Sequence, residues 1–141
     1  MTSMTARTLF PGSAVGEVIC LKQPLSFWGG FDPHTGIVMD RWHPDHGRSL
    51  AGKILVMSAG RGSSSSSTVL AEALRLGTAP AAFILSSSDS ILLTGTLIAF
   101  ALYGRACPMA VAAGADWAMC ARHATLRVHA EDARTVISAP P

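Results

Sequence analysis

Three short apolar runs constrain the fold of this chain more than any other feature. They are Lys53–Met57, Ala81–Leu85 and Pro108–Ala112, and segments with helical character separate them. Short continuous apolar runs are typical of strands that are buried on both faces. Consecutive strands that alternate with helices form parallel neighbours with right-handed crossovers. The middle of the chain is therefore predicted to be a parallel α/β unit.

The segments between these runs carry the patterns of helices. We predict helices over about Thr68–Leu76 and Ser90–Tyr103. Apolar residues of the first segment fall on one face, and Gly77 and Gly104 follow the two segments at positions that suit a left-handed helix end. Either Ser88 or Asp89 can cap the second helix, because both residue types accept hydrogen bonds from the free amides of a first turn.

Further β structure flanks this unit. The predicted strands are Ala14–Leu21, Gly36–Asp40, Thr125–His129 and Arg134–Ser138. The last two alternate polar and apolar residues, which is typical of antiparallel strands with one solvent-exposed face. Most of Lys22–Ser49 is predicted to be ordered loop, and a loop of that length in a compact domain is usually functional. The expected fold is a layered β/β/α domain of the α/β class. We expect a single domain over 1–141, with a core at about 12–112 and a C-terminal β extension at 113–141.

The composition excludes several classes of protein. Hydrophobic residues make up 49% of the 141 residues and charged residues 14%, which is enough to fill a core and argues against disorder. The formal net charge is +2 with no cluster of lysine and arginine, so we expect no nucleic-acid partner. The most apolar run, Ile91–Leu102, is shorter than the ~20 residues of a membrane span. So few charges favour an apolar contact with another protein chain.

The cysteines and histidines give no metal site in this chain. Cys20, Cys107 and Cys120 are an odd number of cysteines without a closely spaced pair, and no apolar leader segment precedes them. We therefore expect reduced thiols in the cytoplasm, buried as small hydrophobic groups. His43 and His46 have a spacing seen in metal sites, but a proline lies between them and no further ligands follow. Surface or supporting histidines are the favoured interpretation.

The most unusual motif is Gly60-Arg61-Gly62 followed by five serines, Ser63–Ser67. It lies between a predicted strand and a predicted helix, where α/β sheets bind ligands and the first helix amides favour anions. Glycines allow a close backbone approach, and Arg61 can hold a carboxylate through two hydrogen bonds. A serine run can also be a linker, but the position between two apolar elements favours an anion site. The loop matches neither a phosphate-binding P-loop nor a hydrolase nucleophile elbow.

An aromatic segment lies earlier in the chain. Phe27 and Trp28 stand beside a pair of glycines, and Asp32 follows shortly after. Aromatic side chains are costly to expose, so these either pack onto the domain or contact a partner surface. Asp32 either orients a histidine or stabilises a turn, which is the commoner role of an aspartate in such a position. Both alternatives stay open for each residue.

Five motifs in one order together resemble the swivel domain of aconitase X. They are Pro24–Gly30, Asp32–Gly36, His43–Gly47, Gly60–Ser67 and Gly77–Ala81. The similarity extends from about Gly12 to Val111 and is more specific than any one motif. The tail after Gly114 carries little of it. The resemblance implies the swivelling β/β/α domain of the aconitase superfamily.

The resemblance also implies a function. Such a chain is the small subunit of a heteromeric hydro-lyase whose large subunit holds an iron–sulfur cluster, expected to be 2Fe–2S, or an iron centre. We expect dehydration of cis-3-hydroxy-L-proline to 1-pyrroline-2-carboxylate, because the serine-only loop resembles bacterial members that degrade amino acids. Two alternatives remain: the small subunit of mevalonate 5-phosphate dehydratase, and a non-catalytic anion-binding module. In both of the dehydratases the substrate is a small hydroxy acid.

In related aconitases a serine of the swivel domain is the base, and the matching residue here is Ser63. A serine alkoxide needs nearby amide hydrogens and positive charge, which the helix start and Arg61 are expected to supply. An arginine follows the two serines in that pattern, whereas Ser65 follows here. Substrate binding is therefore expected from Arg61, Gly62, Ser64 and Ser65, or from the large subunit, whose iron is the expected Lewis acid. The residues expected to contact the partner or to close over the site are Phe27, Trp28, Asp32 and His46.

Overall fold

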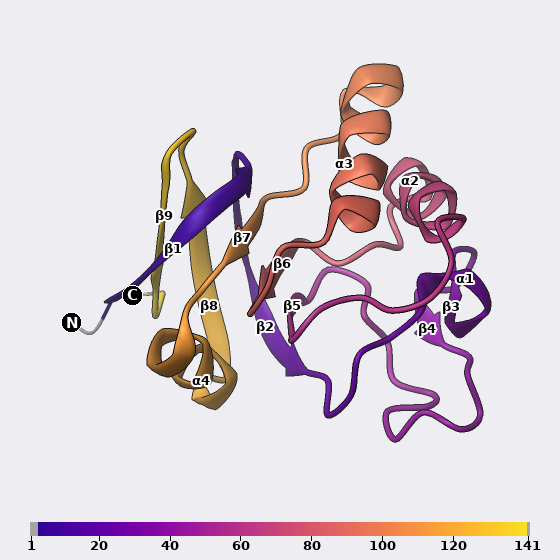
Figure 1. Cartoon of the computed structure of the whole chain (residues 1–141), viewed down its shortest axis with the longest axis horizontal. Helices are drawn as coiled ribbons and strands as arrows, with labels where there is room; N and C mark the ends of the chain where they lie inside the picture. Colours follow the sequence, from indigo (N-terminus) through magenta and orange to yellow (C-terminus); the bar gives the residue numbers. More distant parts are fainter. Residues whose placement is uncertain (1–2, 141) are drawn as a thin grey trace.

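Three parallel strands, β5 (Ile54–Met57), β6 (Ala82–Leu85) and β7 (Met109–Val111), lie side by side at the centre of the molecule (Figure 1). In the computed structural model, which describes residues 3–140, every residue of β5 and β6 is buried. Leu55 belongs to one hydrophobic core and Ile54 to a second. A strand with apolar residues on both faces needs cover on both, as the continuous apolar runs predict.

Four more strands close this sheet into a barrel. They are β1 (Ser3–Phe10), β2 (Gly12–Cys20), β8 (Thr125–Ala130) and β9 (Arg134–Ser138). The strand order is β1-β7-β6-β5-β2-β8-β9, and the pairing of β1 with β9 closes the ring. β2 is parallel to β5 and antiparallel to β8. The predicted α/β class, with parallel strands and additional antiparallel β structure, is confirmed.

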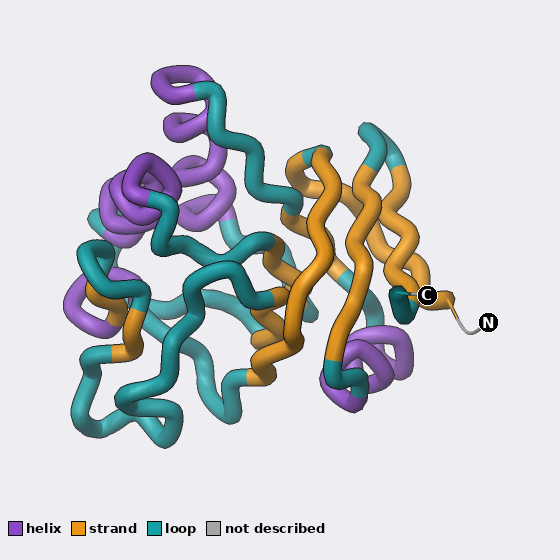
Figure 2. Tube along the Cα trace, turned by 180° about the vertical axis from the view of Figure 1, so that it is seen from behind, coloured by secondary structure: helices purple, strands orange, loops and turns teal. Residues whose placement is uncertain are grey.

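The helices α2 (Ser66–Leu76) and α3 (Ser90–Tyr103) pack against each other on one side of the barrel (Figure 1). They are the crossovers between the parallel strands, and the larger hydrophobic core lies between them and the sheet. Gly77 and Gly104 end them with φ values of +80° and +66°, as predicted. Asp89, rather than Ser88, caps α3. The short α1 (Phe27–Gly30), with β3 (Phe31–Asp32) and β4 (Ile37–Val38), lies in the loop-rich part of Figure 2.

Four elements are absent from the sequence-based expectation: β1, the short α1 and β3, and α4 (Gly114–Arg122). Helix α4 contributes Cys120 to the second hydrophobic core, and its partly buried Trp117 packs against that core. Met4, Leu126 and Ile137 are buried in the same core, although they lie outside the expected core range of 12–112. The segments before and after that range therefore complete the barrel. None of the helices among residues 3–140 is long and apolar enough to cross a membrane.

Candidate functional site

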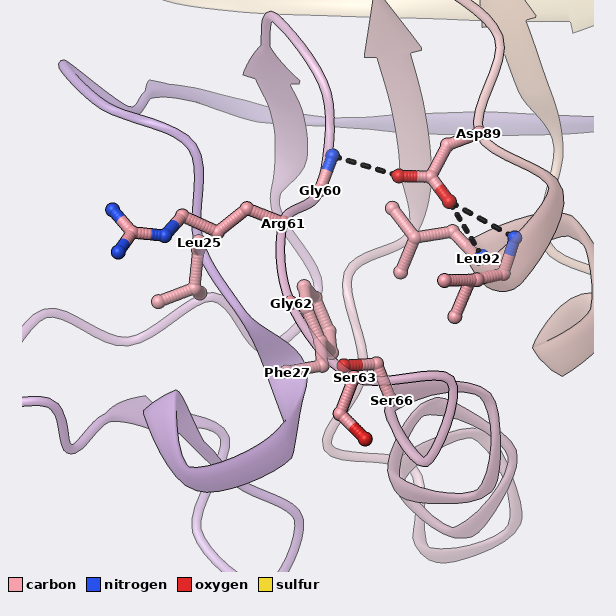
Figure 3. A pocket seen from close by; sticks show the side chains of 10 residues that line it. Leu25, Phe27, Gly60, Arg61, Gly62, Ser63, Ser66, Asp89 and Leu92 are labelled. Carbon is pink, nitrogen blue, oxygen red and sulfur yellow. Dashed lines mark hydrogen bonds between the residues drawn. The ribbon is translucent and has the colours of Figure 1, made fainter.

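A cavity of about 160 Å³ opens where β5 and β6 end (Figure 3). One wall is the loop from β5 to α2, a second is the start of α3, and a third is the segment that leads into α1. The lining residues are Leu25, Phe27, Gly60, Arg61, Gly62, Ser63, Ser66, Asp89, Ile91 and Leu92. The cavity thus lies beyond the carboxyl ends of neighbouring parallel strands, where the sequence places a ligand site.

The loop from β5 to α2 requires glycine at position 62. The N–H of Arg61 donates to the carbonyl of Leu25 at 3.3 Å, which holds the loop against the segment before α1. The next residue, Gly62, has a φ of +93°, and a Cβ there would lie 2.7 Å from Ser26 Oγ. Both the backbone conformation and the close approach exclude a side chain. The turn into the serine run is therefore tightly defined.

The structure distinguishes the serines of the run by the contacts of their hydroxyls. Ser66 is buried, and its Oγ accepts the Trp28 N–H at 2.9 Å, which ties α1 to the start of α2. Ser63 is half-buried at the cavity, and its Oγ accepts the Ser65 N–H at 3.1 Å. Neither Ser64 nor Ser65 lines the cavity. Of the predicted site serines, only Ser63 presents its side chain to the cavity.

The backbone at the start of α2 offers donors without acceptors. Among residues 3–140, no group accepts a hydrogen bond from the N–H of Gly62, Ser63 or Ser64. The N-cap residue, Ser65, makes no side-chain cap bond. Open amides ahead of an 11-residue helix favour an anion, because they add to the positive end of the helix dipole. The local geometry is therefore suited to stabilise negative charge at or near Ser63.

Asp89 is the site residue that sequence reasoning missed. It was expected only as a possible helix cap, yet it also lines the cavity. Its carboxylate accepts the N–H groups of Ile91 and Leu92 at 3.0 Å each and that of Gly60 at 2.9 Å (Figure 3). The sequence held a signal for this contact: β5 and β6 are predicted parallel neighbours, so the loops that follow them meet at the same edge.

Arg61 differs from its expected role. The side chain is exposed, and Figure 3 shows it extending away from Asp89 on the other side of the loop. Within residues 3–140 its guanidinium forms no ion pair and no hydrogen bond. It therefore gives no direct support to the Ser63 hydroxyl in this conformation. The one amide that contacts the Ser63 hydroxyl among the described residues is the Ser65 N–H.

The four residues expected at the partner surface have different positions. Phe27 has no exposed surface: it packs in the core and forms part of the cavity wall, so it is not available as a contact on the outer surface. Trp28 is 58% exposed. Asp32 is half-buried, and the His34 N–H bonded to its Oδ1 at 2.9 Å lowers the pKa of the Asp32 carboxyl. His46 is exposed but does not line the cavity.

The other histidine of the His43–Gly47 motif, His43, has a structural role. His43 is buried, with Nε2 bonded to the Gln23 carbonyl at 3.0 Å and Nδ1 accepting the Asp45 N–H at 3.0 Å. Both ring nitrogens are therefore used to hold the loop. Asp45 also forms an ion pair with Arg48 at 3.0 Å. This loop needs no ligand to explain its buried polar side chains.

The residues of this chain do not fit an iron–sulfur cluster or an iron ion. Within residues 3–140, no three histidine, cysteine, aspartate or glutamate side chains form a group suited to a metal. Burial raises the pKa of Cys107 to about 12 and that of Cys120 to about 11, so both stay protonated thiols, whereas metals bind thiolates. Cys107 and Cys120 also belong to different cores.

The sequence as a whole matches the family model of the aconitase X swivel domain over residues 3–138. The chain belongs to the aconitase X swivel-domain family. A crystal structure of Thermococcus kodakaraensis aconitase X in its holo-form is similar with a TM-score of 0.82 and 35% sequence identity. The similarity covers 99% of this chain and 100% of that chain. The fold expected from the five motifs is confirmed.

Two kinds of relative share this domain. A cis-3-hydroxy-L-proline dehydratase of Pseudomonas aeruginosa is 48% identical over 104 residues, which are 74% of this chain and 18% of the relative. A phosphomevalonate dehydratase small subunit of Methanothermobacter thermautotrophicus is 43% identical over 93 residues, which are 66% of this chain and 71% of the relative. The aligned region is thus under a fifth of the first relative and most of the second.

Proposed function

We propose that this chain is the swivel subunit of a hydro-lyase that dehydrates cis-3-hydroxy-L-proline to 1-pyrroline-2-carboxylate. The observation that carries the proposal is the Ser63 hydroxyl at a cavity, beside amides for which the described part of the chain offers no acceptor. The 48% identity to a dehydratase of that substrate supports the choice of substrate. The chain then acts together with a larger partner that completes the pocket.

The proposed role of Ser63 is that of the base. A proton α to a carboxylate is weakly acidic, so its removal needs a positioned base and stabilisation of the enediolate. The Ser65 N–H that donates to Ser63 Oγ at 3.1 Å favours the alkoxide form. The alkoxide takes the α-proton, the C–H electron pair forms a double bond between the α- and β-carbons, and the β-hydroxyl leaves with its C–O electron pair and takes a proton to become water. The resulting enamine tautomerises to 1-pyrroline-2-carboxylate when its ring N–H proton is lost and the β-carbon gains a proton. The open amides and Arg61 bind the substrate carboxylate.

The cavity needs a partner to become an active site. It is small, its lining has four apolar and four polar side chains, and Arg61 is the one cationic residue among them. We place the metal centre of the enzyme in the large subunit, because the residues described here do not fit one. The assembly is then a heterodimer or a multiple of it. Three free cysteines favour a reducing cytoplasm as its location.

A second candidate function is the small subunit of mevalonate 5-phosphate dehydratase. One observation favours it: small subunits with the phosphomevalonate dehydratase name are matched over 71%, 73% and 74% of their own length. Both reactions remove a proton α to a carboxylate and expel a β-hydroxyl. The same serine and the same amides therefore serve either substrate.

Turnover by the reconstituted pair tests the proposal. The chain is co-expressed with its large partner, the complex is purified, and cis-3-hydroxy-L-proline and mevalonate 5-phosphate are assayed separately. We expect turnover of the proline by the complex and none by the isolated chain. Turnover of the phosphorylated acid alone identifies the second candidate. The third outcome is that the complex is inactive on both acids while the isolated chain binds small carboxylates. That outcome identifies an anion-binding module.

The Trp28 side chain tests the position of the partner. Trp28 is 58% exposed next to the cavity, while Trp42 is 93% exposed on the loop after β4. We expect Trp28→Ala to weaken co-purification of the large partner, because an exposed indole beside the site is a typical interface anchor. Trp42→Ala is the matched control and is expected to leave co-purification unchanged. Equal recovery with both variants contradicts a partner contact at Trp28.

A further inference from the structure

We infer that Asp89 is a positioning residue, which fixes the serine loop in its working conformation by joining it to the start of α3. The inference rests on the proposed function of that loop. Asp89 comes from the loop after β6, whereas Gly60 and Ser63 come from the loop after β5. The carboxylate of Asp89 is the group on the cavity wall that joins the two loops through hydrogen bonds to both.

The two oxygens of the Asp89 carboxylate have separate tasks. Oδ1 accepts the N–H groups of Ile91 and Leu92 at 3.0 Å each, which is an ordinary helix cap. Oδ2 accepts the N–H of Gly60 at 2.9 Å, which has no part in capping. A helix cap alone needs only one oxygen, and serine or asparagine supplies it as well as aspartate. The second oxygen is therefore the distinguishing feature.

The approach of the loop to this oxygen is unusually close. A Cβ on Gly60 would lie 2.7 Å from Asp89 Oδ2, so a side chain at this position would displace the carboxylate from its present contact. Gly60 is three residues before Ser63, and the loop is held next by the Arg61 bond to Leu25 at 3.3 Å. Two residues before Gly60, the Ser58 carbonyl accepts the N–H groups of Ser86 and Ser87 at 3.0 and 3.2 Å. Loss of the Gly60 contact therefore frees the loop between Ser58 and Arg61. The position of Ser63 Oγ relative to a substrate then changes.

The contacts of Asp89 also explain why an acidic residue is tolerated on the wall of an anion site. Three backbone N–H groups donate to this carboxylate, and two of them belong to the first turn of α3. Donors of this kind stabilise negative charge at a helix start. The charge of Asp89 is thus balanced by its own donors, while the open amides at Gly62, Ser63 and Ser64 stay available for the substrate.

Two variants separate the cap from the link to the loop. Asp89→Asn keeps an oxygen for the cap but turns an N–H group toward the N–H of Gly60. Asp89→Ser keeps a capping hydroxyl that is too short to serve both loops. In the complex with the large partner, we expect kcat to fall about 10- to 100-fold in both, since small displacements of a catalytic group have effects of that size. KM and the melting temperature are expected to change little.

A second measurement does not depend on turnover. Amide hydrogen exchange of the full chain is followed at Gly60, Ile91 and Leu92. In Asp89→Asn we expect faster exchange at Gly60 and unchanged exchange at the two helix amides. An active wild-type complex with unchanged kcat and unchanged Gly60 exchange in both variants overturns the inference. A wild-type complex without activity contradicts the proposed function instead, and the exchange data then decide the role of Asp89 alone.

Discussion

Helices α2 and α3 begin at the same cavity, but their first turns are treated in opposite ways. At α3 the carboxylate of Asp89 accepts the N–H groups of Ile91 and Leu92. At α2 the N-cap residue Ser65 makes no side-chain cap bond, and the amides just before it have no acceptor within the described chain. Each helix start carries a partial positive charge of about half a unit. The start of α3 is neutralised by a side chain of the protein, and the start of α2 is the one that we propose binds a ligand.

Under the proposed function, one edge of the sheet holds both a structural helix start, at α3, and a ligand-binding helix start, at α2. The side chains at the start of α2 are small hydroxyls, which leave the amides accessible. The side chain at the start of α3 is the carboxylate of Asp89, which accepts hydrogen bonds from the first amides of that helix and so stabilises it. An acidic side chain placed at the start of α2 should therefore lower activity and raise stability.

The largest effect is expected for Ser63→Ala, compared with Ser90→Ala at the start of α3. Loss of a general base typically lowers kcat by about 10²- to 10⁴-fold. Ser63 lines the cavity, whereas Ser90 is exposed and lies outside its lining. Steady-state turnover of the purified complex measures both variants, and co-purification shows whether assembly is intact. Activity of Ser63→Ala within a few-fold of wild type places the base elsewhere.

A smaller effect is expected for Gly62→Ala, compared with Gly104→Ala. Both glycines have a positive φ, +93° and +66°, so alanine costs about 1–2 kcal/mol of stability at either position. Only at Gly62 does a Cβ also collide, 2.7 Å from Ser26 Oγ. We expect similar losses in melting temperature but a loss of turnover, about tenfold or more, for Gly62→Ala alone. Equal turnover of the two variants contradicts a catalytic conformation of this loop.

The smallest effect is expected when α2 receives an acid, as in Ser65→Asp. A carboxylate near the open amides repels an anionic substrate by about 1 kcal/mol at 4 Å in water, which raises KM about fivefold. The same charge favours the helix dipole by about 0.3–1 kcal/mol, so thermal unfolding should shift upward. Ser65→Asn is the matched neutral control for the lost hydroxyl. We expect a higher KM for Ser65→Asp than for Ser65→Asn. A lower KM for Ser65→Asp contradicts an anion site at these amides.

Much of the fold follows from local patterns. The three apolar runs, both helices with their glycine ends, and the strand Arg134–Ser138 are visible because burial on fixed faces leaves a periodic sequence. β1 was missed because polar residues interrupt its apolar ones and its partners, β7 and β9, are distant in sequence. A strand whose stability comes from such long-range pairing carries a weak local pattern. Closure of the barrel could not be predicted either, because it depends on the same long-range pairing of β1 with β9.

The candidate site also has features that local sequence predicts and features that only tertiary contacts reveal. The serine loop is recognisable because its residue types are unusual together, and its position after β5 was predicted correctly. The particular contacts of Ser66 and Asp89 were not, because each joins two loops that are distant in sequence. The direction of the exposed Arg61 side chain, away from Asp89, was not predicted either. Residue types indicate the chemistry of a site, and tertiary contacts assign the roles.

The pairing of β1 with β9 sets Ser3 directly opposite Ser138, and both ends of the described chain lie on the side away from α1 (Figure 1). A short peptide linker can therefore join them. New ends can then be opened in the exposed turn at Gly104–Ala106, since circular permutation succeeds at exposed loops. The 14 residues of α3 separate that turn from the cavity by about 20 Å. A permuted chain of this kind carries a fluorescent label or a surface tether without touching the serine loop.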